Sequence, residues 1–389
     1  MHAIAPGIFW GSVAVLAYIY AGFGLLVVLW GACRRRAVAQ CPITPRVSLI
    51  VAAYNEAAVI ERKIRNTFDL DYPRRNVELL VASDGSDDGT ETIVLRFEGE
   101  GVQLLALPRR GKIHALDAAV ARATGEILVF SDANSILDAQ ALRNLVRNFA
   151  DPAVGGVCGN QMYVTGRNGD SSGQGEHLYW SYDKWLKGME SQGGSIVSAD
   201  GAIYAIRHPL YRSPESAAVT DDFAISTAVV EQGYRLVYEP AAVAYEHPTG
   251  EARREFSRRV RLMTRGMRGV LLRRRLLDPR RYGFYALVLF SHKVVRRMAP
   301  LCLLALLASS LALAPQSHFY AVATALQLGF YALALCGWIT KSRRVGRSRI
   351  LTVPFFYCLA NLAALVAMAN FLRGERIERW QPQRRGAEA

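Results

Sequence analysis

The chain has 389 residues, of which 51% are hydrophobic and 21% are charged, and its formal net charge at pH 7 is +14. This apolar content excludes a disordered chain, and its concentration in long uncharged runs excludes an ordinary soluble enzyme. The six cysteines form no CxxC pair and no zinc-type spacing with histidine, which argues against a disulfide scaffold and a structural zinc site.

The first segment, residues 3–33, contains no charged residue and no histidine, and it is long enough to cross a membrane. A signal peptide is the alternative, but the run lacks a basic n-region and exceeds the usual h-region of about 7–15 residues. Arg34, Arg35 and Arg36 follow directly. The positive-inside rule therefore predicts a retained anchor over residues 1–36, with its N-terminus outside and the following chain in the cytoplasm.

The region from about residue 45 to residue 250 alternates short apolar runs with helical patterns. This alternation predicts an α/β domain with a mainly parallel sheet and helices on its faces. The predicted strands are 47–53, 77–83, 103–107 and 127–131, and the predicted helices between them are 57–69, 88–98 and 113–124. Ligands of such sheets bind beyond the carboxyl ends of the strands, so the residues there form the candidate site.

Polar residues follow each of these four strands. They are Tyr54-Asn55-Glu56 after the first, residues 84–90 after the second, residues 108–112 after the third and Asp132-Ala133-Asn134 after the fourth. Neither GxGxxG nor GxxxxGK[ST] occurs, so the dinucleotide-binding and P-loop fingerprints are missing. Asp84 and Asp132 are available for a ribose, a base or a metal, and Lys112 begins a helix that favours a phosphate. Singly, each loop also fits a capping turn or a solvated charge.

The order of these motifs resembles the family 2 glycosyltransferases, and more narrowly the membrane-embedded branch with the cellulose, chitin, hyaluronan and poly-N-acetylglucosamine synthases. The resemblance covers about residues 47–270. The matching segments are 51–56, 84–90, 111–112, 131–134, 201–207 and 220–222, and Trp380-x-Pro-x-Arg384 near the end also fits. The resemblance implies a GT-A (Rossmann-like) fold and inverting transfer from a nucleotide-diphosphate sugar.

The resemblance also implies roles on the donor side. Nucleotide-sugar binding would involve Tyr54, Glu56, Asp84, Lys112, Asp132, Arg258 and Arg261. Asp132 and Asn134 stand at the metal-binding DxD positions, where the second acid is replaced by a neutral oxygen ligand. Mg²⁺ or Mn²⁺ is the expected cofactor, because both ions favour oxygen ligands.

On the acceptor side, Asp221 and Asp222 stand at the last two positions of the family's Thr-Glu-Asp motif. The last residue of that motif is the catalytic base, which takes the proton of the attacking sugar hydroxyl. A pair of aspartates here also fits a helix N-terminus. Gly201 and Ala202 begin the acceptor-side segment, where small residues leave room for a hydroxyl.

A basic helical pattern follows over residues 251–297. Arg254, Arg258, Arg261, Arg265 and Arg268 recur at spacings of four and three, which places them on one helical face. Processive relatives carry Gln-x-x-Arg-Trp here; this chain has Arg258 and Leu262 in place of Gln and Trp, and it keeps Arg261. Arg258 and Arg261 are expected to bind the diphosphate, whereas Arg265 and Arg268 are expected to face an anionic membrane surface.

Further apolar segments follow. Residues 298–314, 318–340 and 350–372 are predicted membrane helices, and a basic loop (341–349) and a basic tail (373–389) flank the last of them. Residues 282–297 have too short an apolar run to span and are predicted to be an interfacial helix. The tail lies outside if the last helix crosses fully; otherwise that helix is kinked at Pro354 and does not cross.

These features predict an integral protein of a bacterial-type plasma or inner membrane with a cytoplasmic catalytic domain. It would transfer a hexose or N-acetylhexosamine from a UDP-sugar to a growing polysaccharide. Membrane lipids are expected partners, and nucleic acid is not. Four spans are few for a polymer channel, so a homo-oligomer or an export partner is a further expectation. The alternatives are transfer of one sugar to a polyprenyl-phosphate-linked acceptor, and a non-catalytic nucleotide-binding scaffold.

Overall fold

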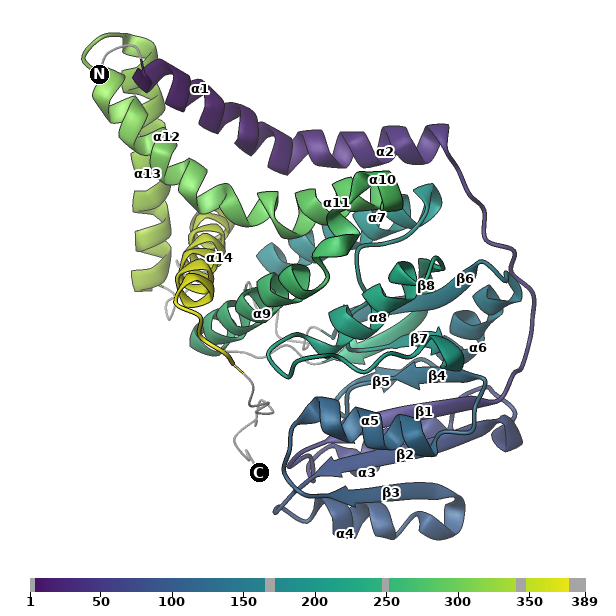
Figure 1. Cartoon of the computed structure of the whole chain (residues 1–389). Coiled ribbons are helices and arrows are strands. Elements are labelled where there is room, and N and C mark those ends of the chain that lie inside the picture. Colours follow the sequence, from purple (N-terminus) through teal and green to yellow (C-terminus); the bar gives the residue numbers. More distant parts are fainter. Residues whose placement is uncertain (1–3, 165–171, 247–251, 341–347, 378–389) are drawn as a thin grey trace.

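The computed structural model describes residues 4–164, 172–246, 252–340 and 348–377 (Figure 1). Trp380, residues 341–347 of the basic loop and residues 378–389 of the tail lie outside the described residues. A domain with a central sheet occupies one end of the molecule, and a group of long helices occupies the other (Figure 1).

The sheet has eight strands in the order β3-β2-β1-β4-β7-β6-β8-β5. The four predicted strands are confirmed as β1 (Val47–Ala53), β2 (Val77–Asp84), β3 (Val102–Leu107) and β4 (Ile127–Phe130), and all four run parallel. The others are β5 (Ile136–Leu137), β6 (Val154–Tyr163), β7 (Tyr204–Arg207) and β8 (Arg235–Glu246). β7 runs antiparallel to both of its neighbours, β4 and β6.

Both faces of the sheet are buried. β1 is buried at every position, with Ile50 and Ala52 in one hydrophobic cluster and Leu49 and Val51 in the other. This alternation follows from the two-residue period of a strand. Helices α3 (Ile60–Phe68), α4 (Thr90–Leu95) and α6 (Ala141–Val146) cover one face; α5 (Lys112–Arg122), α7 (Ser172–Gly193) and α8 (Asp221–Glu231) cover the other.

Four helices of the described chain are long and apolar enough to cross a membrane, by length and composition. The first candidate span joins α1 (Ile4–Ala17), a π-helical turn η1 (Tyr18–Gly22) and α2 (Phe23–Cys33). The second joins α11 (Phe284–Lys293), the turn η7 (Val295–Met298) and α12 (Ala299–Leu313). The last two are α13 (His318–Thr340) and α14 (Arg349–Leu372), and α14 continues through Pro354.

Helix α11 contains most of the segment predicted to be interfacial. Tyr285, Val288 and Leu289 are buried in the cluster that also covers the sheet, whereas Leu287 and Phe290 are exposed. The indole of Trp30 on α2 stacks on the Phe284 ring at 4.3 Å between centroids. The first candidate span and α11 are therefore packed onto the sheet domain rather than separated from it.

Candidate active site

The loops after β1, β2, β3 and β4 meet at one edge of the sheet. The side chain of Asn55 accepts a hydrogen bond from the Asp87 amide at 2.9 Å, and Thr90 accepts one from the Glu56 amide at 2.9 Å. The loop after β3 bonds to Asp84, and Lys112 reaches the loop after β4. The structure therefore brings together the four polar segments that the sequence places after consecutive strands.

Asp84 is the centre of the first part of the site. Its carboxylate is fully buried and accepts hydrogen bonds from the amides of Arg110 (2.7 Å) and Gly111 (2.8 and 3.0 Å), and from the guanidinium of Arg109. The same guanidinium lies over the Tyr54 ring, 3.3 Å from its centroid. A carboxylate, a cation and an aromatic face are thus held together, as recognition of a planar base requires.

Sequence reasoning did not single out Arg109. Gly85, which follows Asp84, allows the backbone of Arg109 to approach closely. Gly85 has a φ of +68°, and a Cβ there would lie 2.8 Å from the Arg109 amide nitrogen. Only the motif Pro-Arg-Arg-Gly-Lys hinted at this arginine, and nothing in that motif says which of its two arginines turns toward Asp84.

Lys112 joins the loop after β4 to the start of α8. Its Nζ lies 2.8 Å from Asp132 Oδ1 and 2.9 Å from Asp221 Oδ2, and its side chain is 15% exposed. Burial lowers the pKa of Lys112, but the two carboxylates raise it by more, so the ammonium remains charged. One cation therefore links the loop after β4, which carries the predicted metal ligands Asp132 and Asn134, to Asp221 in the motif of the predicted base.

Asp221 and Asp222 are the first two residues of α8, and Thr220 is its N-cap residue. Burial raises the pKa of Asp221, but the charge and hydrogen bond of Lys112, the charge of Arg265 and a backbone hydrogen bond together lower it by more, and the net shift is downward. Burial, followed by the charge of Asp221, raises the pKa of Asp222 to about 6. Two adjacent carboxylates thus differ in proton affinity, and Asp222 is the one able to take up a proton near neutral pH.

Glu56 lies on the same side of the site. Burial, with smaller contributions from Asp132 and Asp88, raises its pKa to about 7, and Lys112 opposes this shift. The charges of Asp132 and Lys112 act on Glu56, so it lies close to the loop after β4. A carboxyl in this position is poised to exchange a proton when a cation or a phosphate arrives.

The acceptor-side residues contact the predicted metal loop. A Cβ at Gly201 would lie 3.1 Å from Asp132 Oδ2, so the glycine permits this close approach. The carbonyl of Ala202 accepts a 2.7 Å hydrogen bond from the Ser131 hydroxyl. The segment predicted to lie beside the acceptor is thus fixed to the loop predicted to hold the diphosphate.

The residues present fit a divalent metal of the hard type. The Asp132 side chain is 35% exposed and Asn134 is exposed, so both can offer oxygens to an ion. Within the described ranges there is no group of three or more His, Cys, Asp or Glu that could enclose a metal. Mg²⁺ and Mn²⁺ sites in phosphate-transfer enzymes often use only one or two carboxylates, with substrate phosphates and waters completing the shell.

Lys63 is a second feature that sequence reasoning missed. It lies on α3, is fully buried, and donates 2.6 Å hydrogen bonds to the Ser131 hydroxyl and the Ser135 carbonyl. Ser135 in turn donates to Glu246 on β8. A buried lysine therefore holds both ends of the loop that carries Asp132 and Asn134.

Helix α9 (Ala252–Leu272) carries the arginines predicted to contact the diphosphate. Arg258 is ion-paired with Glu255 at 2.8 Å and also interacts with Tyr163, so a diphosphate role for Arg258 requires that pair to open. Burial lowers the pKa of Arg261, and the charges of Arg265 and Arg258 lower it further. Leu262, at the Trp position of processive relatives, is 41% exposed.

The membrane-surface role expected for Arg265 is wrong in this structure, because that side chain is buried. Arg268 is partly exposed, and the role expected for it stays a prediction. Arg265 is buried and donates to the backbone carbonyls of Ala217 (3.2 Å) and Val219, just before α8. Arg268 donates to the Glu375 carbonyl at 2.5 and 3.0 Å. The helical spacing was right, and both guanidiniums donate to backbone carbonyls of distant segments.

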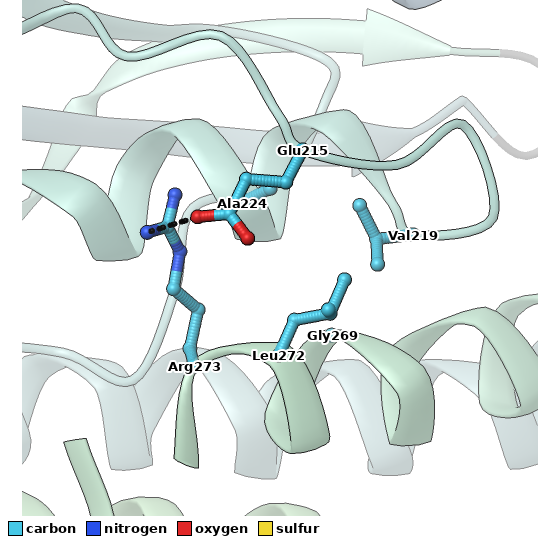
Figure 2. A pocket seen from close by; sticks show the side chains of 6 residues that line it. All are labelled: Glu215, Val219, Ala224, Gly269, Leu272 and Arg273. Atoms are coloured by element: carbon cyan, nitrogen blue, oxygen red, sulfur yellow. Dashed lines mark ion pairs between the residues drawn. The ribbon is translucent and has the colours of Figure 1, made fainter. Parts of the chain in front are cut away.

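A small cavity lies behind the start of α8, between that helix and α9 (Figure 2). Its volume is about 10 Å³, which is room for one water molecule at most. Glu215 and Arg273 face each other across it at 3.9 Å. The cavity is too small for a nucleotide sugar, so it belongs to the support of α8.

Comparison with known proteins gives a consistent result. The model of the family described as Glycosyl transferase family 2 matches residues 48–213. Poly-beta-1,6-N-acetyl-D-glucosamine synthases of Staphylococcus aureus (strain COL) and Staphylococcus epidermidis are each 26% identical over 207 residues, which are 51% of this chain and 49% of theirs. The match thus spans about half the length of these curated relatives.

Among solved structures, the mannosyltransferase PcManGT from Pyrobaculum calidifontis, in complex with GDP-Man and Mn²⁺, superposes with a TM-score of 0.71. The sequences are 24% identical, and the match covers 95% of this chain and 99% of that one. The similarity therefore includes the helices outside the sheet domain. The predicted GT-A fold with an added helical region is confirmed.

Proposed function

Because residues 48–213 form a family 2 glycosyltransferase domain, we propose that the chain transfers a sugar from a nucleotide-diphosphate donor to an acceptor hydroxyl at a membrane. The observation that carries the proposal is the bridge from Asp132 through Lys112 to Asp221, beside an Asp222 with a pKa of about 6. This bridge supports the proposal because it brings the loop of Asp132, proposed to bind the diphosphate, close to the residue next to the proposed base Asp222.

On the donor side, Asp84, Tyr54 and Arg109 hold the nucleotide, and Lys112 neutralises the charge that develops on the leaving diphosphate. Asp132 and Asn134 would hold Mg²⁺ or Mn²⁺, which supplies further charge neutralisation when bound. Arg261 is proposed to add a guanidinium to the same phosphates.

On the acceptor side, Asp222 accepts the proton of the attacking hydroxyl. The hydroxyl oxygen forms a bond to the anomeric carbon, the bond from that carbon to the diphosphate oxygen breaks, and the electron pair leaves with the nucleoside diphosphate. Attack from the face opposite the leaving group inverts the anomeric configuration. Asp221 stays ionised and keeps Lys112 in place, while Gly201 and Ala202 leave space for the hydroxyl.

The names of the curated relatives support an N-acetylhexosamine and a growing polysaccharide, so a UDP-sugar is the proposed donor. The PcManGT structure was determined with GDP-Man and Mn²⁺, which makes a GDP-hexose the donor to compare. The proposed orientation has the N-terminus outside and the catalytic domain in the cytoplasm, because Arg34, Arg35 and Arg36 follow the first candidate span.

One observation favours a second candidate function, the transfer of a single sugar to a lipid-linked acceptor. Leu262 is an exposed aliphatic side chain at the position where processive relatives are expected to have an aromatic platform. Leucine lacks the flat π-face on which a sugar of a moving polymer would stack. Product length separates the two candidates.

The test uses the purified full chain in nanodiscs with Mn²⁺ or Mg²⁺, a panel of radiolabelled UDP- and GDP-sugars and a native lipid extract. The labelled product is then sized. A polymer ladder supports synthesis of a polysaccharide, and a lipid-extractable monoglycoside supports the second candidate.

The Asp222→Asn variant tests the mechanism. Turnover should fall by about 10²–10⁴-fold, while nucleotide binding stays close to that of the wild type. Asp71→Asn is the matched control, since Asp71 is an exposed aspartate paired with Arg143 away from the site. Equal transfer by wild type and Asp222→Asn would show that Asp222 is not the base.

A further inference from the structure

The loop between α7 and β7 leads into the proposed acceptor-side residues, and several elements hold its backbone. The Val197 amide donates to Glu190 on α7 at 3.1 Å, and the Val197 carbonyl accepts a 2.9 Å hydrogen bond from the hydroxyl of Tyr285 on α11. The Ala199 amide donates to the hydroxyl of Ser226 on α8 at 3.0 Å. The loop is therefore attached to three helices, one of which begins with the proposed base motif.

Asp200 is the charged residue of this loop. Its carboxylate pairs with the ammonium of Lys187 on α7, and its backbone amide donates to the Cys158 sulfur at 3.4 Å. The next residue, Gly201, lies against the loop after β4, since a Cβ there would be 3.1 Å from Asp132 Oδ2. The ion pair of Asp200 is thus one residue away from the contact between the acceptor side and the proposed metal site.

Lys187 is buried and makes two ion pairs. Its side chain is 11% exposed, and its Nζ contacts Asp183 at 3.3 Å in addition to Asp200. Burial lowers the pKa of Lys187, but the charges of Asp200 and Asp183, with the Cys158 thiol and the hydrogen bond to Asp200, together raise it by more. The ammonium therefore stays charged, and removing it would leave two carboxylates without their shared partner.

A membrane-side helix holds Lys187 from the other side. Asp183 lies one helical turn before Lys187, and its Oδ1 is 3.5 Å from Nε2 of His292 on α11. Helix α11 belongs to the second candidate span. Lys187 is therefore held between α11, through Asp183, and the loop before β7, through Asp200.

We propose that Lys187 is a positioning residue for the sugar transfer, which acts through Asp200 to hold Gly201 in its place on the acceptor side. The inference rests on the proposed transferase function and adds the residue that sets the acceptor side of that site. Neither Lys187 nor Asp200 belongs to the segments that resemble the family. The donor side should not depend on Lys187, because the loop after β4 has its own contacts with Lys63 and Lys112.

The test uses the full chain in nanodiscs with Mn²⁺, a native lipid extract and the nucleotide sugar that gives a labelled product. Lys187→Met should lower the rate of transfer by about 100-fold, which is the effect of a displacement of about 1 Å. KM for the donor and the affinity for Mn²⁺ should stay close to wild type. Asp200→Asn should show the same pattern, and the double variant should be no less active than the less active single variant, because both changes break one contact.

Lys184→Met is the matched control. Lys184 is a half-buried lysine of the same helix, and the charge of Asp200 acts on it, but Lys187 is the lysine that pairs with Asp200. Transfer by Lys184→Met should be close to wild type. The control therefore separates the direct ion pair from the general effect of a positive charge nearby.

Hydrogen exchange gives a second measurement that needs no turnover. The amides of Ala199 and Asp200 are hydrogen-bonded in the wild-type structure. Lys187→Met and Asp200→Asn should raise the exchange rate of a peptide over residues 196–203 by about tenfold, because the loop opens more often. Lys184→Met should leave that rate unchanged.

Three results would overturn the inference. The first is transfer and exchange by Lys187→Met equal to wild type. The second is an equal loss of transfer and of nucleotide binding, which would indicate a general role in the fold. The third is an additive loss in the double variant, which would show that Lys187 does not act through Asp200.

The proposed function can fail separately. If wild type transfers sugar from no donor, while exchange rises in Lys187→Met and Asp200→Asn but not in Lys184→Met, the transferase is refuted and the support of the loop by Lys187 stands. If wild type transfers sugar and Lys187→Met does so equally well, only the role of Lys187 is refuted. Should Lys187→Met fail to fold, Asp200→Asn decides by the same two measurements.

Discussion

Replacing Lys63 by methionine should disturb the loop after β4, which carries the proposed metal ligands, far more than it lowers the stability of the fold. Lys63 is fully buried under that loop and donates hydrogen bonds of 2.6 Å to both Ser131 and Ser135. Methionine fills a similar volume but donates no hydrogen bond. The loop that carries Asp132 and Asn134 would lose both of its anchors on α3.

The expected change in stability is small because two effects oppose each other. Each hydrogen bond from a charged donor contributes about 1.5–3 kcal/mol, so the loss of two costs about 3–6 kcal/mol. The variant no longer has a buried ammonium, so a desolvation penalty of about several kcal/mol is removed. The free energy of unfolding should therefore change by less than about 2 kcal/mol. A shift of the loop by about 1 Å, however, can lower catalysis by about 100-fold.

The assay compares wild type, Lys63→Met and Arg65→Met, where Arg65 is an exposed residue of the same helix paired with Glu61. Mn²⁺ affinity in the presence of nucleotide, turnover and thermal unfolding are measured for each. Lys63→Met should need about tenfold more Mn²⁺ or above, with little change in melting temperature, whereas Arg65→Met should match wild type. A Lys63→Met protein with wild-type Mn²⁺ affinity and turnover would refute the reasoning.

The stability difference between wild type and Lys63→Met should also depend on pH, in a direction set by the pKa of Lys63. Burial lowers the pKa of Lys63 from 10.5 to about 7, although Asp132 and Glu246 oppose the shift. Between these two values the unfolded chain holds a proton that the folded chain has released, so the stability of wild type relative to Lys63→Met should rise with pH over that window. A stability difference that is flat over the window would show that burial does not lower the pKa of Lys63.

Three further predictions concern the site itself. Because burial and Asp221 raise the pKa of Asp222 to about 6, the transfer rate should fall as pH drops below about 6, and a rate that is constant down to pH 5 would exclude Asp222 as the base. Asp84→Asn should weaken nucleotide binding by about tenfold, measured by calorimetry, because the carboxylate that fixes Arg109 is lost; unchanged affinity would place the nucleotide elsewhere. Leu262→Trp should lengthen the products if an aromatic platform is what processive growth lacks, and an unchanged product size would remove Leu262 as the determinant.

The sequence predicts the parallel half of the sheet well, and the reason is physical. β1, β2 and β4 are largely buried runs of apolar residues, and the edge strand β3 is a partly exposed one; each is followed by a polar loop, and each property is local to its segment. The meeting of those loops follows from the parallel arrangement alone. The antiparallel β7, between β4 and β6, could not be predicted in this way, because its place depends on which distant strands remain unpaired.

Buried cations are the part of the site that the sequence does not reveal. In the sequence, Lys63 resembles a solvent-exposed lysine of an amphipathic helix. Only the fold shows that it lies under the loop after β4. Arg265 matches the spacing of a membrane-facing stripe, yet its partners are carbonyls some 46 residues away in the chain. A charge is assigned to solvent, lipid or core by its tertiary partners, and a helical period carries no information about them.

Helix α9 connects the start of α8, where Asp221 and Asp222 lie, to the last candidate span. Arg265 holds the carbonyls just before α8, and Arg273 pairs with Glu231 at the end of α8 at 2.7 Å. Between them, Arg268 binds the Glu375 carbonyl beyond α14. Both ends of the helix that begins with Asp221 and Asp222 are therefore fixed by α9, which is itself attached to the last candidate span. If Asp222 is the general base, as proposed, its position is set by the same helices that include the candidate spans.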